Sequence, residues 1–396
     1  MNPKAKKWTL GQSNAWNEIR EHQKLVLGHP TIWMHTASYG EFEQGLPIIE
    51  AIKEAYPNYK IWVTFFSPSG YEHRKNEPLV DVVTYLPFDS KKNAALFIEL
   101  VNPKLVVFVK YEFWFYYLNE AKNKNIPVIL ASAIFRSNQI FFKWYGNFYK
   151  NMLSLFTSIL VQNKTSYELL MHNIQHQNIA ITGDTRFDRV IKTVSQTNHI
   201  SWINLLSNHK KIIAGSTWTA DEIILNKTTA HFNEFNWIIV PHHVDPKSIQ
   251  STLNIFPNAI TLTQLLDSGI QHPKPIVLIV DKIGLLRTLY QYSYISYIGG
   301  GFGKDGVHNV LEPAAFGKPV IWGANDLKYS EAIGLRNHKG GYSIHNEADL
   351  IMHISNLLQS SDTYNQICQN AHNYIIENEG ATKKTMSEIV KYLSVS

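Results

Sequence analysis

The sequence predicts an α/β protein with two parallel-sheet domains, and three observations support that fold class. Short runs that are apolar at every position alternate with segments whose apolar residues recur at helical spacing. Such runs are typical of strands buried on both faces, as in a parallel sheet covered by helices. The alternation stops in the polar stretch 194–200 and then starts again. We therefore expect two Rossmann-like domains that face a central cleft, with ligands at the carboxyl ends of the strands.

Each half of the chain contains its own set of expected strands. Those of the first half are 32–34, 61–66, 82–86, 105–109, 128–131, 159–161 and 179–182, separated by helical patterns such as 45–56 and 113–124. Those of the second half are 212–214, 237–240, 259–262, 276–280, 292–298 and 319–322. A last helix is expected over 381–392. We place the first domain at 1–195, the second at 196–380, and the last helix within 381–396.

Composition limits the functional classes. The 396 residues suffice for two cores, and 44% of them are hydrophobic. A single cysteine, Cys368, excludes an internal disulfide framework and fits a reducing compartment. The net charge of +5 suits an anionic substrate or an anionic lipid surface. We find no nucleic-acid motif, and no apolar run long enough to span a membrane.

The glycine-rich stretch 299–319 is the most informative segment. Three consecutive glycines follow an apolar run, and we expect a helix to begin around His308 and Asn309, with Glu312 one turn later. A strand, a glycine turn and a helix N-terminus together favour a bound phosphate. The Glu312 carboxylate could accept hydrogen bonds from both sugar hydroxyls of a nucleotide. The alternative is a turn that only reverses the chain.

Charged residues follow several expected strands of the first half. Glu41 opens a helix after the first strand, where it could act as a general base, or could be a first-turn acid that the helix dipole favours. Lys110 and Glu112 follow the fourth strand, and the alternative there is a helix cap with a solvated lysine. Arg186 could hold an anion, or could pair with Asp184 or Asp188.

Small and polar residues follow the strands of the second half. Ser216 and Thr217 precede an expected helix, where hydroxyl groups suit a phosphate but are equally ordinary caps. His242 and His243 follow another strand. Adjacent residues of an extended chain point apart, and no ligand set surrounds this pair, so we expect no metal. The turn at 281–284 could present backbone groups to a base.

Two segments suggest a membrane surface. The first thirty residues are basic, with lysines at positions 4, 6, 7 and 24, and form either a solvated tail or a segment near acidic headgroups. The stretch 139–156 predicts one aromatic helix with apolar positions 141, 144, 145, 148, 152 and 156 on one face. Lys143 and Lys150 flank that face. Such a helix is either buried or covered by a lipid.

Four segments together resemble the 3-deoxy-D-manno-octulosonic acid (Kdo) transferases of lipopolysaccharide biosynthesis. These are HTASYGEFEQGLPII, YKIWVTFFSPSGYE, GDTRFD and GGGFGKDGVHNVLEP, and the similarity runs over nearly the whole chain. The resemblance implies a GT-B fold whose C-terminal helix crosses back to the first domain. It implies an inverting transfer of Kdo from CMP-Kdo to a lipid A precursor (lipid IVA), with no cofactor and no bound metal.

The resemblance also assigns roles to residues. It places the base at Glu41 and the basic group that stabilises the transition state at Arg186. The implied CMP contacts are His242, His243, Ile283, Gly284, Leu285, Asn309, Val310, Leu311 and Glu312. Many members have Glu-x-Glu where this sequence has Lys110 and Glu112, so either Glu112 takes the catalytic role of the first acid or Lys110 acts on the phosphate. An arginine is usual at His242, and a proline at Val310.

The family commonly carries an apolar N-terminal anchor that this sequence lacks. We therefore expect action at the cytoplasmic face of the inner membrane, either peripherally on its anionic surface or through an N-terminal segment missing here. Two other functions stay open at this point. One is a catalytically inactive nucleotide-binding or scaffolding protein, and the other is a GT-B enzyme that uses a UDP-sugar.

Overall fold

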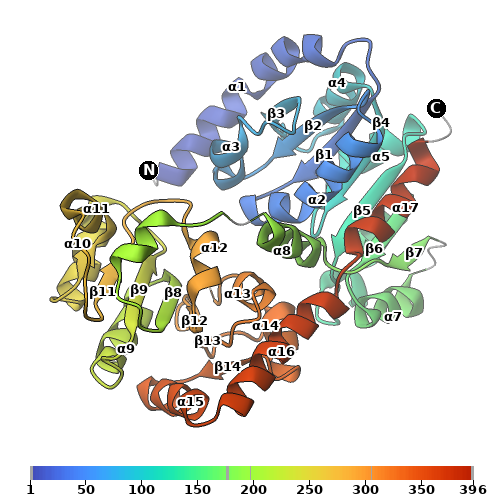
Figure 1. Cartoon of the computed structure of the whole chain (residues 1–396). Coiled ribbons are helices and arrows are strands. Elements are labelled where there is room, and N and C mark those ends of the chain that lie inside the picture. Colours follow the sequence, from blue (N-terminus) through green and yellow to red (C-terminus); the bar gives the residue numbers. More distant parts are fainter. Residues whose placement is uncertain (1–2, 175–177, 197, 305, 394–396) are drawn as a thin grey trace. The chain divides into compact units, whose positions relative to one another are not determined.

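The computed structural model describes residues 3–174, 178–196, 198–304 and 306–393. The chain forms two compact units, Met1–Arg189 with Asn378–Ser396, and Val190–Glu377. Each contains a seven-stranded, fully parallel sheet with helices packed against it (Figure 1). The predicted fold class, α/β with two Rossmann-like domains, is confirmed. The units divide at Arg189 and Glu377, whereas the sequence analysis expected boundaries at 195 and 380. The central cleft between the domains stays a prediction.

The sheet of the N-terminal unit has the strand order β3-β2-β1-β4-β5-β6-β7. All of its strands except the edge strand β7 are almost entirely buried, which explains why their sequences are largely apolar. β1 and β4 are neighbours in the centre of the sheet. Because they are parallel, their carboxyl ends lie side by side at the same edge of the sheet. The strands are β1 Thr31–Thr36, β2 Lys60–Phe65, β3 Val82–Tyr85, β4 Pro103–Val109, β5 Val128–Ala133, β6 Ser158–Val161 and β7 Ile179–Ile181.

Helices connect these strands, and the last helix of the chain also belongs to this unit. Asp188 accepts hydrogen bonds from the backbone N–H groups of Gly380 (2.6 Å) and Thr382 (2.5 Å), and Tyr392 lies 2.8 Å from Ser158. These bonds attach α17 to α8 and to the strand β6. The helices are α1 Pro3–Val26, α2 Tyr39–Ala55, α3 Pro68–Arg74, α4 Lys91–Val101, α5 Phe115–Asn123, η1 Ile140–Phe142, α6 Asn147–Leu153, α7 Lys164–Asn173, α8 Thr185–Ser195 and α17 Ala381–Leu393.

The C-terminal unit repeats the architecture with the order β10-β11-β9-β8-β12-β13-β14. Its strands are β8 Lys211–Thr217, β9 Asn236–Pro241, β10 Ile260–Thr261, β11 Val277–Ile279, β12 Ile295–Ile298, β13 Val320–Gly323 and β14 Gly341–Ile344. Its helices are η2 Ser201–Leu205, α9 Thr219–Thr229, α10 Pro246–Ile255, α11 Leu262–Ser268, α12 Leu286–Leu289, η3 Tyr290–Tyr292, α13 Leu311–Ala315, α14 Ser330–Asn337, α15 Glu347–Gln359 and α16 Ser361–Glu377. Segments that follow the carboxyl ends of β8, β9, β11 and β12 carry the predicted donor residues.

Three expectations about local structure are wrong. The basic N-terminal segment forms the helix α1 rather than a solvated tail, because Ala15 and Ile19 are buried and the Gln12 side chain donates to the Leu86 carbonyl oxygen (2.9 Å). The stretch 139–156 is not one helix but η1 and α6 joined by a turn. The strand expected over 292–298 begins only at Ile295, because η3 precedes it.

The turn between η1 and α6 has a steric cause. A Cβ atom at Gly146 would lie 1.9 Å from the carbonyl oxygen of Ile140, so only glycine allows the chain to pass there. Phe141, Met152 and Phe156 are buried, whereas Trp144, Tyr145 and Phe148 are exposed. The expected single apolar face therefore does not exist. Among the helices described, none has the length and apolar character that crossing a bilayer requires.

Candidate active site

Glu41 lies in the first turn of α2, directly after the carboxyl end of β1. Its Oε2 accepts hydrogen bonds from the Ser38 backbone N–H (2.9 Å), which belongs to a capping box, and from the Ser38 hydroxyl (3.1 Å). Within the described residues, Oε1 has no hydrogen-bond partner. Burial raises the pKa of Glu41, and the neighbouring Glu112 raises it further. The side chain thus caps its helix and keeps one oxygen for another ligand.

A chain of buried hydrogen bonds fixes Glu112 next to this site. His35 Nε2 lies 2.9 Å from Glu112 Oε2, and the Trp114 indole N–H donates to the same oxygen at 2.6 Å. His35 Nδ1 lies 2.8 Å from the hydroxyl of Thr64. His35 is fully buried and Glu112 nearly so. Through His35 on β1 and Thr64 on β2, these bonds fix the orientation of the Glu112 carboxylate.

Lys110 follows β4 in a left-handed backbone conformation, with φ of 71°. This conformation is uncommon for a residue with a Cβ and re-aims the chain at the strand end. The Lys110 ammonium lies 5.4 Å from the centroid of the Tyr111 ring, and its charge lowers the pKa of Glu41. Glu41, Lys110 and Glu112, three residues predicted from the sequence, are therefore brought together with His35.

Arg186, the predicted basic group, is engaged in an ion pair. Its guanidinium donates to Asp184 Oδ2 from Nε (3.0 Å) and Nη2 (2.7 Å), and its backbone N–H donates to Oδ1 (3.0 Å). Gln44 Nε2 donates to the same Oδ1 at 3.1 Å. Burial alone would raise the pKa of Asp184, but Arg186 outweighs it and holds that pKa below the usual value. Of the two interpretations of Arg186, the structure contains the pair with Asp184.

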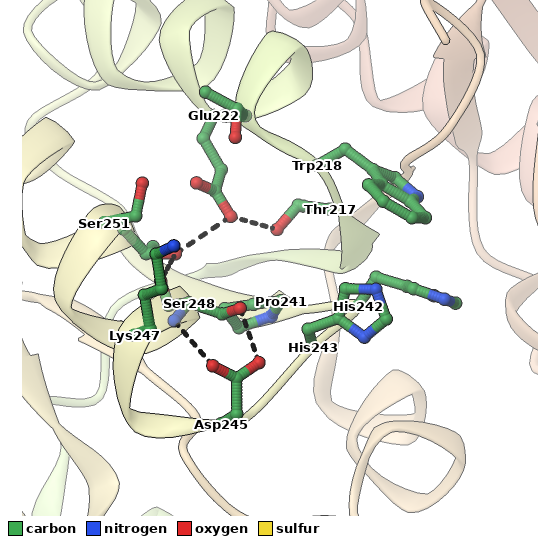
Figure 2. Close-up of a pocket in the computed structure, with 12 residues that line it drawn as sticks. Thr217, Trp218, Glu222, Pro241, His242, His243, Asp245, Lys247, Ser248 and Ser251 are labelled. Atoms are coloured by element: carbon green, nitrogen blue, oxygen red, sulfur yellow. Dashed lines mark hydrogen bonds between the residues drawn. The ribbon is translucent and has the colours of Figure 1, made fainter. Parts of the chain in front are cut away.

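The C-terminal unit has a pocket at the carboxyl ends of β8 and β9 (Figure 2). It encloses about 430 Å³, which lies in the range of small-molecule sites. Thr217, His242 and His243 line it, as do residues that the sequence analysis did not identify: Trp218, Thr219, Glu222, Pro241, Asp245, Lys247, Ser248, Ser251 and Thr252. Glu222 forms the buried wall, where its Oε1 accepts from the hydroxyls of Thr217 (3.0 Å) and Thr252 (3.1 Å). Burial raises the pKa of Glu222.

Four rings from three loops meet beside this pocket. His242 stacks on Trp218 (4.6 Å between ring centroids) and on His308 (4.6 Å), and the Trp218 indole N–H donates to His308 Nε2 at 3.0 Å. The rings of His242 and His243 lie 4.7 Å apart, so the expectation that they point apart is wrong. They follow β9, which ends at Pro241, and so escape strand geometry. No three possible metal ligands converge in the described part of the chain.

The triple glycine packs against neighbouring backbone. A Cβ at Gly299 would lie 2.3 Å from the Ser216 carbonyl oxygen, and Gly300 has a left-handed φ of 91°. Buried Asp221 accepts from the N–H groups of Gly300 (2.9 Å) and Trp218 (2.9 Å) and from the Tyr297 hydroxyl (2.8 Å). Burial raises the pKa of Asp221. The glycines are thus needed to bring the loops after β8 and β12 into contact.

The remaining predicted donor residues form a separate group. Glu312 accepts from Arg287 Nε at 3.1 Å, so an ion pair connects α13 with α12, the helix that follows the loop of Ile283, Gly284 and Leu285. Ile283 is 85% exposed. The side chains of Val310 and Leu311 are buried, which leaves only their backbone for a ligand. These residues do not line the pocket of Figure 2.

Two further placements concern the loops around this group. The expected helix start at His308 is wrong, because α13 begins at Leu311, where Asn309 Oδ1 accepts from the Leu311 N–H at 3.1 Å. Ser216 has a left-handed φ of 55° within the strand end of β8. The sequence contained a usable signal for His35, which opens the HTASYGE segment, but none that connected Trp218 or Arg287 with the site.

Comparison with known proteins shows which family the chain resembles. Residues 11–189 match the family described as 3-deoxy-D-manno-octulosonic-acid transferase (kdotransferase). The 3-deoxy-D-manno-octulosonic acid transferase of Haemophilus influenzae is 26% identical over 375 residues, covering 91% of this chain and 87% of the relative. That of Aquifex aeolicus is 27% identical over 337 residues, covering 83% and 86%.

Solved structures agree on the fold. UDP-GlcNAc 2-epimerase from Neisseria meningitidis, bound to UDP-GlcNAc, has a TM-score of 0.64 at 16% identity, covering 91% of this chain and 100% of that chain. A glycosyltransferase from Rickettsia africae has a TM-score of 0.59 at 14% identity, covering 93% and 100%. The resemblance found in the four sequence segments is confirmed: residues 11–189 match the Kdo transferase family, and the chain is related over most of its length to glycosyltransferases named as Kdo transferases.

Proposed function

We propose that this protein transfers Kdo from CMP-Kdo to a lipid A precursor, lipid IVA, in lipopolysaccharide biosynthesis. One observation supports this function most strongly. Glu41, in the HTASYGE segment, has a raised pKa and one carboxylate oxygen without a hydrogen-bond partner among the described residues, beside Lys110 and Glu112. This is the placement that a general base requires, and it lies inside the domain that matches the Kdo transferases.

The proposed reaction is a single displacement. A primary hydroxyl of the glucosamine disaccharide attacks the anomeric carbon of Kdo, its proton passes to Glu41, and the bond from the anomeric carbon to the phosphate oxygen of CMP breaks. Attack from the face opposite the leaving group inverts the configuration. A raised pKa makes Glu41 a stronger base than an ordinary glutamate, which favours removal of a proton from an alcohol.

Glu112 and Lys110 then have supporting roles. Glu112 is fixed by His35 and Trp114, and its negative charge sustains the basicity of Glu41. Lys110 opposes that effect, and its ammonium could instead attract the anionic donor. Both charge effects are measurable: loss of Glu112 should lower the kinetic pKa of the base, whereas loss of Lys110 should raise it.

The C-terminal domain would bind the donor. His242, His243 and Thr217 line the pocket of Figure 2, and Glu312 with Leu285 belongs to the neighbouring group. Cationic side chains and backbone N–H groups would stabilise the charge that develops on the departing CMP phosphate without a metal ion. Since the donor is a soluble nucleotide sugar and the acceptor a lipid, we also propose that the protein acts at the cytoplasmic face of the inner membrane.

Incubation of the purified protein with CMP-Kdo and a tetraacylated lipid A precursor tests this function. Mass spectrometry should show the acceptor with added Kdo, and CMP should be released in equal amount. Calorimetry with CMP and UDP distinguishes the alternatives. Binding of UDP but not CMP would indicate a UDP-sugar enzyme, and binding of CMP without any product would indicate an inactive nucleotide-binding protein.

A further inference from the structure

The exposed aromatic side chains are confined to one unit. Within the described residues, the large hydrophobic side chains of the C-terminal unit that face solvent are aliphatic or methionine, such as Ile223, Leu327 and Met352. Every exposed Phe, Tyr or Trp ring of the described residues lies in the N-terminal unit: Tyr39, Phe88, Tyr116, Trp144, Tyr145, Phe148 and Tyr149. Scattered exposed apolar residues need no explanation, but rings gathered on one domain indicate a contact surface.

Six of these rings lie on adjacent elements. Phe115 connects two of them, since its ring centroid lies 5.3 Å from that of Tyr116 and 5.1 Å from that of Phe148. The Phe148 and Tyr149 rings lie 5.4 Å apart. The loop of Phe88 joins the same group because its neighbour Asp89 accepts from the Tyr116 N–H at 3.0 Å. We call the aromatic face the set Phe88, Tyr116, Trp144, Tyr145, Phe148 and Tyr149.

The turn that presents Trp144 and Tyr145 is firmly built. The Gly146 N–H donates to the Lys143 carbonyl oxygen (2.9 Å), and the Lys143 N–H donates to that of Ile140 (3.1 Å). Phe141 anchors the turn in the core, with its ring 4.7 Å from that of Phe113. Trp144 is nevertheless 90% exposed. The turn therefore holds two large rings in solvent, and ordering them there costs little further entropy. Because rings in solvent bury no apolar surface, this placement does not stabilise the fold.

Basic residues predominate around this face, where the half-buried Asp89 in the loop of Phe88 is acidic. The connection from β5 to β6, residues 134–157, contains Arg136, Lys143 and Lys150 and no acidic residue. Lys91 and Lys92, both exposed, follow the loop of Phe88. Aromatic rings bordered by lysines are typical of an interfacial membrane surface, where rings lie at the level of the headgroups and cations reach the phosphates.

The connection from β5 to β6 also approaches the candidate active site. The Tyr111 ring lies beneath both Lys110, at 5.4 Å, and Arg136, at 5.9 Å. Arg136 begins the connection that carries Trp144, and Lys110 belongs to the cluster with Glu41. One end of the connection that carries four of the six rings therefore lies close to the cluster that contains the proposed base.

We propose that the aromatic face docks on the surface of an anionic phospholipid bilayer, with its rings among the headgroups and Lys143 and Lys150 on lipid phosphates. The inference deepens the proposed function. It rests on that function only in assigning a purpose to the docking, which is to bring the site of Glu41 to a lipid acceptor. Binding to vesicles is measured without turnover, so the two can fail separately.

Co-sedimentation with vesicles of phosphatidylglycerol and phosphatidylcholine tests the proposal. We expect Lys143→Glu with Trp144→Ser to weaken binding about tenfold or more, because it removes an interfacial ring and reverses a charge near the lipid surface. A matched control exists in the other unit, where Leu327 is 81% exposed and precedes Lys328. Leu327→Ser with Lys328→Glu makes the same changes of charge and polarity and should leave vesicle binding unchanged.

The inference is overturned if the wild type does not bind vesicles, if both double variants lose binding equally, or if neither does. It is also overturned if the wild type self-associates in sedimentation velocity and Lys143→Glu with Trp144→Ser abolishes that association, because the face would then be a protein interface. Should that variant not fold, Tyr145→Ser, which alters a 60% exposed ring, replaces it. CMP affinity should be equal in all variants. Vesicle binding that depends on this face, without any Kdo transfer, would refute the proposed function alone.

Discussion

Replacing Arg186 tests whether this residue only pairs with Asp184 or also holds an anion. The burial of Asp184 sets the expected loss in the free energy of unfolding. Arg186→Met removes the guanidinium from Asp184, which is only 7% exposed, and leaves that carboxylate with Gln44 and one backbone N–H. Breaking a buried ion pair on one side costs about 3–5 kcal/mol of the free energy of unfolding. Because two hydrogen bonds remain, we expect a loss of about 3 kcal/mol at neutral pH.

This loss should depend on pH in a defined direction. In the wild type the pKa of Asp184 is depressed, so its contribution to stability is present above the unfolded-state value near 3.8 and is lost as the pH falls through the folded-state value. The difference between variant and wild type should therefore vanish in acid. Hydrogen exchange of the β1 amides is a suitable assay, because the two domains can unfold separately. A loss below about 1 kcal/mol at pH 7 would refute the reasoning from burial.

The double variant Arg186→Met with Asp184→Asn separates stability from catalysis. It leaves no buried charge, and replacing both partners of an ion pair is often nearly neutral for stability. If the double variant folds and retains turnover, Arg186 serves only its pair with Asp184. If it folds but turnover falls while CMP affinity is kept, Arg186 also stabilises the transition state, as the family resemblance implies.

Three more predictions follow from the site. Glu312→Ala should weaken CMP binding by about 1.5–3 kcal/mol in calorimetry, whereas Arg287→Ala breaks the same ion pair and keeps the carboxylate; equal losses would mean that Glu312 acts only through the pair. The value of kcat/KM should fall as the pH drops through the raised pKa of Glu41, because the base must be ionised, and a fall only near the ordinary value of 4.5 would contradict this. Turnover should persist in EDTA, and loss of activity that magnesium restores would show that a metal takes part.

The sheets were predictable because their strands are buried on both faces. β1 and β9 are buried at every position, so apolar runs marked them. β14 escaped prediction because Gly341–Ile344 is a short edge strand whose middle residues are partly exposed. α1 was mistaken for a tail because most of its residues are polar, and tertiary contacts such as that of Gln12 with Leu86 stabilise it. In 139–156, the steric demand at Gly146 outweighed the helical spacing.

For the site, the sequence predicted the positions but not the partners. Glu41 and Glu112 were identified at strand ends, yet the bond between His35 and Glu112 joins residues 77 positions apart. The stack of Trp218, His242 and His308 likewise depends on three loops meeting. Long-range contacts of this kind follow from the strand order, which single-sequence patterns do not specify.

The most direct test of the account is the turnover of Glu41→Gln with CMP-Kdo and a lipid A precursor. Glutamine can still accept the hydrogen bonds from Ser38, so the capping box and the fold should persist, while the ability to take a proton is lost. We predict that turnover falls by about 100-fold or more, with CMP affinity unchanged. Turnover close to that of the wild type in a folded Glu41→Gln variant would contradict the assignment of Glu41 as the base.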